Sequence, residues 1–185
     1  MRQSLLGILL ITLVTISCKR EQNPFEISKH HVGLLTDSTQ VKDLEAIFPN
    51  DSIVTNTDSD AFLGANYDYE IFDKSGNKLL ILTPKSAMDS TSVIQSVQIM
   101  DPRFKTNANI TTESTFKDIS NAYKISKINN MINSVLISVN DLNASFSIDK
   151  KELPANLRFD MDMKIEETHI PDNAKIKYFF INWNN

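Results

Sequence analysis

The chain has 185 residues, a formal net charge of −4 and a single cysteine, Cys18, so no disulfide can form within one chain. Basic residues form no cluster along the sequence beyond the pairs Lys19-Arg20 and Lys150-Lys151, which excludes a nucleic-acid footprint and a basic stripe for an anionic membrane surface. Glycine occurs only four times, too rarely for loops that cradle phosphate groups.

Residues 1–17 have the order of a secretory signal peptide. Arg2 precedes an apolar run, and small hydroxyl residues flank Ile16 directly before Cys18. The run is shorter than the roughly 20 residues that a membrane-spanning helix needs. The arrangement resembles the lipobox of bacterial lipoproteins. This resemblance implies cleavage before Cys18, acylation of Cys18 with palmitate-type chains, and a lipidated tether over residues 18–24.

The same resemblance bears on localisation. Lys19 follows Cys18, whereas enterobacterial lipoproteins that are retained in the inner membrane have Asp at this position. We therefore expect a lipid-anchored protein of the bacterial cell envelope, facing the periplasm, with the outer membrane favoured over the inner membrane.

Residues 25–185 are predicted to form one globular α+β domain, with an antiparallel sheet and two helices packed on one face. Alternating or continuous apolar residues predict strands over 25–29, 52–57, 67–73, 78–83, 93–100, 131–139, 144–149 and 174–183. Apolar residues at helical spacing predict helices over 41–48 and 116–123. Residues 56–64 and 84–91 are rich in turn residues and are expected to be surface loops.

The pattern around the first helix returns around the second. Asn109 stands where Gly33 stood, and both residue types favour a left-handed turn. Lys117-Asp118-Ile119 echoes Lys42-Asp43-Leu44 after a shift of one residue. These matches predict a repeat of about 75 residues, with two tandem strand-helix-strand-strand-strand units at 25–92 and 93–185. The alternative is one α+β domain whose helices merely use similar caps.

Two resemblances accompany this pattern. The turn-then-helix unit resembles that of small outer-membrane lipoproteins of the SmpA/OmlA type and of β-lactamase-inhibitor-like tandem repeats, which implies a protein-binding module. It is carried by Gly33, Thr36, Ser38, Leu44 and Phe48. Residues 101–106 and 170–177 are similar to uncharacterised lipoproteins from Bacteroidetes-like bacteria, a resemblance that implies no activity.

Residues 157–165 show the cleanest alternation in the chain, which predicts a strand with one buried face. The apolar face has Leu157, Phe159, Met161, Met163 and Ile165, and the polar face has Arg158, Asp160, Asp162 and Lys164. Met161 and Met163 together with His169 also suggest a soft-metal site for copper, although burial explains both methionines. Asp160 and Asp162 form a carboxylate pair that Arg158 and Lys164 neutralise.

The remaining candidate sites are simpler. His30 and His31 are expected to be surface residues. Asp58-Ser59-Asp60 before Gly64 suggests a calcium loop, but its spacing favours a turn. Ser38, Ser52 and Ser90 each follow Asp and resemble the O-glycan acceptors of Bacteroidetes-like exported proteins, although Asp-Ser is also common at helix caps and turns.

No constellation of nucleophile and base is present in the sequence, so the chain is predicted not to be an enzyme and to need no cofactor. We expect a membrane-anchored, non-enzymatic binding or envelope-assembly module with a protein partner in the envelope and no nucleic-acid partner. The alternative is a lipoprotein that handles a small ligand or a soft metal.

Overall fold

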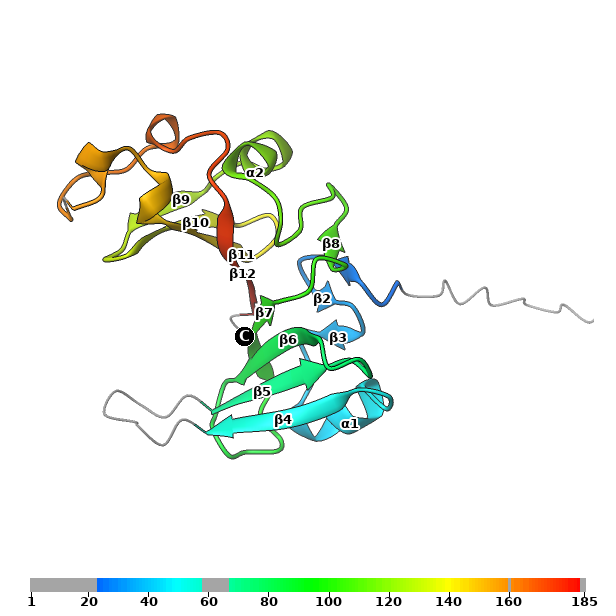
Figure 1. The fold of residues 1–185 in the computed structure, drawn as a ribbon. Coiled ribbons are helices and arrows are strands. Elements are labelled where there is room, and N and C mark those ends of the chain that lie inside the picture. Colours follow the sequence, from blue (N-terminus) through cyan, green and yellow to red (C-terminus); the bar gives the residue numbers. More distant parts are fainter. Residues whose placement is uncertain (1–22, 58–66, 160, 184–185) are drawn as a thin grey trace, which may run out of the picture.

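The computed structural model describes residues 23–57, 67–159 and 161–183, which form two sheets (Figure 1). The larger sheet is antiparallel throughout, with the strand order β4-β5-β6-β7-β12-β11-β10-β9. Its strands are β4 (Ser52–Thr57), β5 (Tyr67–Phe72), β6 (Lys78–Pro84), β7 (Ile94–Ile99), β9 (Lys127–Asn130), β10 (Ser134–Val139), β11 (Ala144–Asp149) and β12 (Ile176–Asn182).

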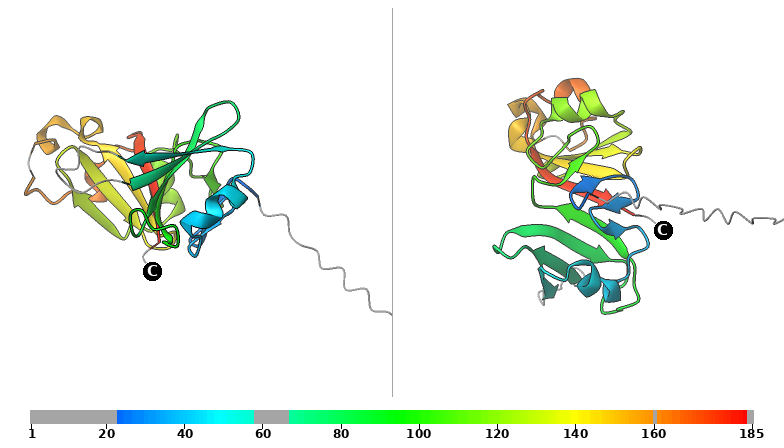
Figure 2. Two further views of the ribbon diagram at one scale, coloured as in Figure 1. Left: turned by 90° about the horizontal axis from the view of Figure 1, so that it is seen from below. Right: turned by 90° about the vertical axis from the view of Figure 1, so that its right-hand side faces the viewer.

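The smaller sheet joins four two-residue strands in the order β3-β2-β1-β8. These strands are β1 (Glu26–Ile27), β2 (His31–Val32), β3 (Leu35–Thr36) and β8 (Lys105–Thr106), and β1 runs parallel to β8. This sheet lies beside the middle of the larger one (Figure 2), where the Trp183 indole Nε1 donates a hydrogen bond to the Lys29 carbonyl oxygen over 3.1 Å.

Helices are few and short. The 3₁₀ turn η1 (Val41–Asp43) leads into α1 (Leu44–Ile47), and α2 comprises Phe116–Ala122. The first turn of α2 is held by a reciprocal capping box, because Thr115 Oγ1 accepts from the Asp118 amide and the Asp118 carboxylate accepts from the Thr115 amide. Three further 3₁₀ turns connect β11 to β12, namely η2 (Lys150–Glu152), η3 (Ala155–Leu157) and η4 (Glu167–His169).

The register of the larger sheet places one apolar row across all eight strands. In strand order the row is Ile53, Ile71, Leu80, Ile99, Phe179, Phe146, Ile137 and Ile128. The six central members are at most 2% exposed. The neighbouring row contains Glu70, Gln98, Ser145, Ser138 and Lys127, since successive residues of a strand point to opposite faces.

Both helices add apolar side chains to the cluster that covers the buried row. Leu44 and Phe48 come from the end of the first helical segment, and Phe116 and Ile119 come from α2. The expected α+β class and the antiparallel sheet are therefore confirmed.

Hydrogen bonds that tie each helix to a later strand occur in corresponding pairs. The Val41 amide donates to the Ser92 carbonyl and the Phe116 amide donates to the Ala174 carbonyl. In the reverse direction, the Ile94 amide donates to Thr39 and the Ile176 amide donates to Ser114. Upstream of these contacts, Gly33 and Asn109 have φ values of 56° and 60°, so the left-handed backbone expected at both positions is confirmed.

The expected strand over 157–165 is wrong. Pro154 begins the 3₁₀ turn η3, and the Arg158 Nε donates to the Leu153 carbonyl oxygen over 2.8 Å. Leu157 and Ile165 are buried as expected, but Phe159 is 88% exposed and Met161 is 45% exposed. The segment lies within the connection between β11 and β12, and both of those strands already have neighbours on each side. The segment reaches the edge strand β9 only through the Asn130 side chain, which donates to the Met161 and Met163 carbonyl oxygens, and it forms no backbone ladder with that strand.

Other differences are smaller. The strands β2, β3, β8 and β9 were not predicted, because two to four residues give too short a pattern to recognise. The segment 58–64, which the sequence favoured as a turn over a calcium loop, and Asp160 lie outside the described residues. None of the helices formed by the described residues is long and apolar enough to cross a membrane.

Candidate functional site

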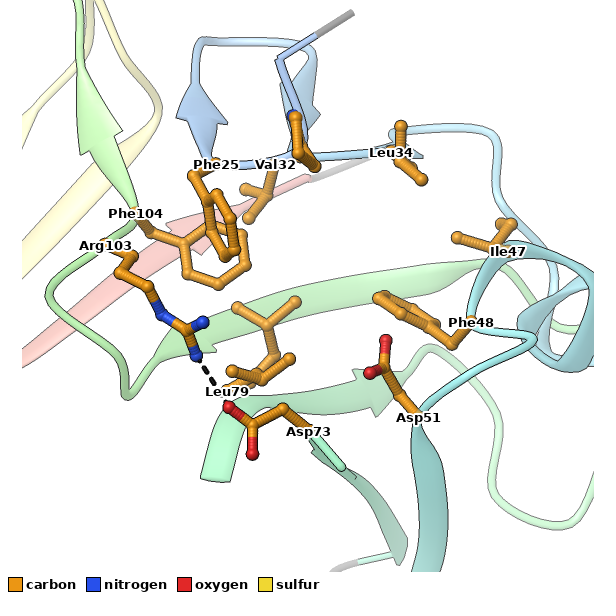
Figure 3. A pocket seen from close by; sticks show the side chains of 13 residues that line it. Phe25, Val32, Leu34, Ile47, Phe48, Asp51, Asp73, Leu79, Arg103 and Phe104 are labelled. Carbon is orange, nitrogen blue, oxygen red and sulfur yellow. Dashed lines mark hydrogen bonds and ion pairs between the residues drawn. The ribbon is translucent and has the colours of Figure 1, made fainter. Parts of the chain in front are cut away.

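An apolar hollow of about 170 Å³ lies between the small sheet, the end of α1 and the β5–β6 hairpin (Figure 3). We call it the apolar hollow. It is lined by Pro24, Phe25, Val32, Gly33, Leu34, Ile47, Phe48, Asp51, Asp73, Leu79, Leu80, Arg103 and Phe104. Pro24 is the last residue of the predicted tether and part of the lining, so the apolar hollow lies beside the point where the tether joins the domain.

Aromatic rings form one wall of the apolar hollow. Phe25 and Phe104 pack edge to face, with ring centroids 5.1 Å apart, a favoured geometry for aromatic pairs. Phe48 faces them from the end of α1 (Figure 3). Phe104 is 2% exposed and Phe48 is 9% exposed, so these rings are fixed by the core and give the hollow a preformed shape.

Gly33 allows this wall to close. Its amide donates to the Glu26 carbonyl oxygen over 2.8 Å, and its φ is 56°. A Cβ atom at this position would overlap the Pro24 carbonyl oxygen and lie 3.2 Å from a ring carbon of Phe104. The turn therefore needs glycine both for its left-handed backbone and for its close approach to the wall.

Gly33→Ala is expected to lower the free energy of unfolding by about 1–3 kcal/mol, because left-handed strain and the overlap with Pro24 act together. Gly76→Ala is the matched control, since Gly76 has a φ of 81° and nothing within 4 Å of an added Cβ. The measurement is chemical denaturation of both variants. Equal losses would show that Gly33 makes no close contact of consequence.

An ion-paired arginine borders the apolar hollow. Arg103 Nε and Nη2 donate to the two oxygens of Asp101 over 2.9 and 2.8 Å, and Nη2 also donates to Asp73 Oδ2 over 2.9 Å. Its guanidinium lies 4.9 Å from the centroid of the Phe25 ring. The arginine is thereby held as part of the wall, and its charge is already matched by two carboxylates.

The two acids keep their charge to low pH. Hydrogen bonds from the Asn77 amide and side chain, with a further bond from Arg103, lower the pKa of Asp73 to about 2. Hydrogen bonds from the Arg103 guanidinium are the main cause of the lowered pKa of Asp101. Because these pKa values lie below those of an unfolded chain, the contribution of the charged network is complete above about pH 4 and is lost as the pH falls toward 2.

The lining of the apolar hollow is mainly apolar. It contains no serine, threonine, cysteine, histidine or lysine, and two of its three charged side chains, Asp73 and Arg103, neutralise each other. The third, Asp51, lies beside Phe48 (Figure 3). An arrangement of this kind can hold an apolar group, with Asp51 and the Asp73–Arg103 pair excluding groups of the wrong shape or charge at its rim.

The sequence-predicted copper ligands have other partners. The Met161 sulfur accepts a hydrogen bond from the Lys150 ammonium over 3.2 Å, and His169 Nδ1 accepts from the Glu166 amide over 3.1 Å. The Met163 carbonyl oxygen accepts from the Asn130 side chain. A copper ion at the Met161 sulfur would stand beside a positive charge. Within residues 23–57, 67–159 and 161–183, no three His, Cys, Asp or Glu side chains are grouped to hold a metal.

The remaining predicted sites are separate from one another, and His31 is half-buried, unlike the surface residue that was expected. Ser38, Ser52 and Ser90 are exposed, as a glycan acceptor requires. His30 pairs with Asp37 over 2.7 Å, and His31 Nδ1 lies 2.6 Å from the Ser28 hydroxyl. Cys18, the expected acylation site, lies outside the described residues.

The structural comparison supports the fold. The chain is similar to the uncharacterised protein yfeY from Escherichia coli, with a TM-score of 0.57 and 13% sequence identity over 85% of this chain and 99% of that chain. At this identity the likeness shows a shared fold and no shared activity. No protein-family model and no curated protein sequence matches the chain.

Proposed function

We propose that the chain is an exported lipoprotein, anchored in the outer membrane through an acylated Cys18, whose domain is a non-enzymatic binding module for an envelope protein. The apolar hollow is the observation that carries this proposal. It is preformed, it is lined by side chains without a nucleophile, and it opens beside Pro24, where the domain meets the predicted tether. With five residues between Cys18 and Pro24, the hollow would lie within about 20 Å of the bilayer.

The size of the apolar hollow indicates what it holds. A cavity of about 150 Å³ lined by apolar side chains is large enough for benzene, and the apolar hollow has about 170 Å³. One aromatic or large aliphatic side chain of a partner therefore fits. Apolar anchors that enter preformed pockets supply much of the affinity of protein interfaces, which makes a single inserted side chain an adequate basis for recognition.

We further propose that the domain consists of two tandem repeats with two helices on one face of the sheet. The paired hydrogen bonds that join the beginning of each helical segment to the residues around the start of β7 and of β12 support a repeat, and so do the left-handed turns at Gly33 and Asn109. The hydrogen bonds place Thr39 and Ser114 in corresponding positions. The sequence match of Gly33 with Asn109 would instead pair Thr39 with Thr115, one residue later. The shift of one residue therefore falls between the turn and the helix cap, upstream of Thr36 and Thr111. A protein-binding role is what the resemblance to SmpA/OmlA-type repeats implies.

Site-specific photocrosslinking tests the binding role. A photoreactive residue at Leu34, which lines the apolar hollow and is 46% exposed, is expected to crosslink one reproducible envelope protein. Filling the hollow with Leu79→Phe should abolish that adduct in the folded protein, because the partner side chain loses its space. The readout is the crosslinked mass of the purified adduct.

Val54 is the matched control position. It is 47% exposed and lies on β4, outside the lining of the apolar hollow. An adduct that forms equally from both positions, or that survives Leu79→Phe, would contradict the proposed use of the hollow.

Handling of a small ligand is the second candidate, and the same volume favours it. An apolar molecule about the size of benzene would fill the apolar hollow without a protein partner. In that case a small aromatic compound should raise the unfolding temperature of the purified protein but not that of Leu79→Phe, and Leu34 should give no protein adduct. Copper handling finds no support in the partners of Met161.

A further inference from the structure

A second hollow lies where the connection between β11 and β12 meets the turn between β9 and β10. It has a volume of about 440 Å³. Four basic side chains and one acidic side chain line it, namely Lys150, Lys151, Arg158, Lys177 and Asp149. We call it the basic hollow. This concentration of positive charge occurs in a chain whose net charge is −4.

Among residues 23–57, 67–159 and 161–183, one of the four cations forms an ion pair with a carboxylate. Lys177 Nζ pairs with Asp149 Oδ2 over 3.0 Å. In the part of the chain that the structure describes, Lys150, Lys151 and Arg158 form no ion pair with a carboxylate. The Arg158 guanidinium donates from Nε to the Leu153 carbonyl oxygen, which fixes the orientation of its planar fork. Three positive charges therefore converge without a carboxylate partner among the described residues.

Lys150 is the decisive residue. It is 4% exposed, and among the described residues the only hydrogen-bond acceptor for its ammonium is the Met161 sulfur at 3.2 Å. An ammonium has three donors, and a thioether is a weak acceptor. Lysine is almost never fully buried unless it is paired, because an uncompensated buried charge is costly. A buried ammonium at the wall of a basic hollow indicates that an anion completes the site.

We propose that the basic hollow binds a phosphate group through Lys150, Lys151 and Arg158. A phosphate monoester offers up to two negative charges and three strong acceptor oxygens, which suits two ammonium groups and a guanidinium fork better than a single carboxylate does. This site is separate from the apolar hollow, and it does not depend on the function proposed for that hollow.

The rim of the basic hollow suggests where the rest of the ligand lies. Phe159 is 88% exposed and Ile132 is 76% exposed, and both line the hollow. Large apolar side chains beside a phosphate site suit a ligand with an apolar portion. The phosphate belongs either to a lipid headgroup, whose acyl chains would lie on Phe159 and Ile132, or to a soluble phosphate ester.

Thermal unfolding and calorimetric binding test the site with three probes at matched ionic strength: inorganic phosphate, glycerol 3-phosphate and short-chain phosphatidic acid. Wild-type protein should be stabilised by at least one of them relative to chloride. Lys150→Met, which keeps the length of the side chain and removes the charge, should weaken that binding by about tenfold or more. Lys74→Met removes an exposed lysine of the β5–β6 turn and should leave binding unchanged.

Two further variants make the result decisive. Lys151→Gln alters an exposed lining residue and should weaken binding severalfold even if Lys150→Met does not fold. Phe159→Ser should weaken phosphatidic acid selectively if the source is a lipid and should weaken neither ester if the source is soluble. The proposal is overturned if no probe binds, or if Lys150→Met and Lys151→Gln bind the probes as tightly as Lys74→Met does.

Discussion

Phe179→Ala is expected to remove about 3–5 kcal/mol from the free energy of unfolding, a large part of the stability of an ordinary domain. Phe179 lies on β12, whose neighbours in the sheet are β7 and β11. Its ring is fully buried and packs against Phe146 with centroids 4.5 Å apart. Truncation at this position opens a cavity in the row that links the two halves of the sheet. Urea denaturation followed by circular dichroism measures the loss.

Tyr178→Ala is the matched control, one residue away on the opposite face of the same strand. Tyr178 is 43% exposed, and its ring lies 6.2 Å from that of Phe180. Its removal should cost less than about 1 kcal/mol. Similar losses in both variants would mean that β12 is stabilised by its hydrogen bonds and not by the packing of the buried row.

This contrast also shows how the two faces of the last strand are covered. Its sequence is apolar on both faces, which favours either a strand covered on both sides or one face offered to a partner. In the structure Phe179, Ile181 and Trp183 are buried, whereas Tyr178 is exposed and Phe180 is half-buried. The alternation of the buried row is visible in the sequence, but the covering of the second face depends on which elements pack there.

Local patterns predicted the fold where neighbouring residues decide the structure. The Asp73–Asn77 turn between β5 and β6 is fixed by hydrogen bonds from the Ser75 and Asn77 amides to the Asp73 carboxylate. Residues of these types are typical of turns, so the sequence predicts this one. The capping box of Thr115 and Asp118 is equally local. The strand predicted over 157–165 is wrong because alternation shows only that a segment is amphipathic. It does not show whether the segment pairs with a neighbouring strand.

The two hollows could not be predicted from local patterns. The apolar hollow joins Phe25, Phe48, Leu79 and Phe104, which come from four separate segments. The basic hollow joins Lys150 and Arg158 to Lys177, although the sequence has no basic run there. Lys150 follows a strand and precedes another lysine, a context that predicts exposure. Lys150 is nevertheless buried, and its ammonium donates to the sulfur of Met161, eleven residues later in the segment that was expected to be a strand.

Cys18→Ser is expected to abolish lipid attachment and release the protein from the membrane fraction. Acylation requires the thiol of Cys18, and Cys18 is the only cysteine of the chain, so no second thiol can replace it. The acidic chain has no basic stripe along its sequence that would hold it on an anionic surface. Labelling with a palmitate analogue, followed by membrane fractionation, measures both effects in the host envelope.

Ser17→Ala is the control for this test, because it changes the adjacent residue and keeps a small side chain before the cysteine. It should retain the label and the membrane fraction. The basic hollow makes the comparison more informative. If Cys18→Ser loses its label yet remains on the membrane, and Lys150→Met then releases it, the domain itself holds a lipid phosphate. If Cys18→Ser keeps both label and membrane, the anchor is not at Cys18 and the proposed lipoprotein is wrong.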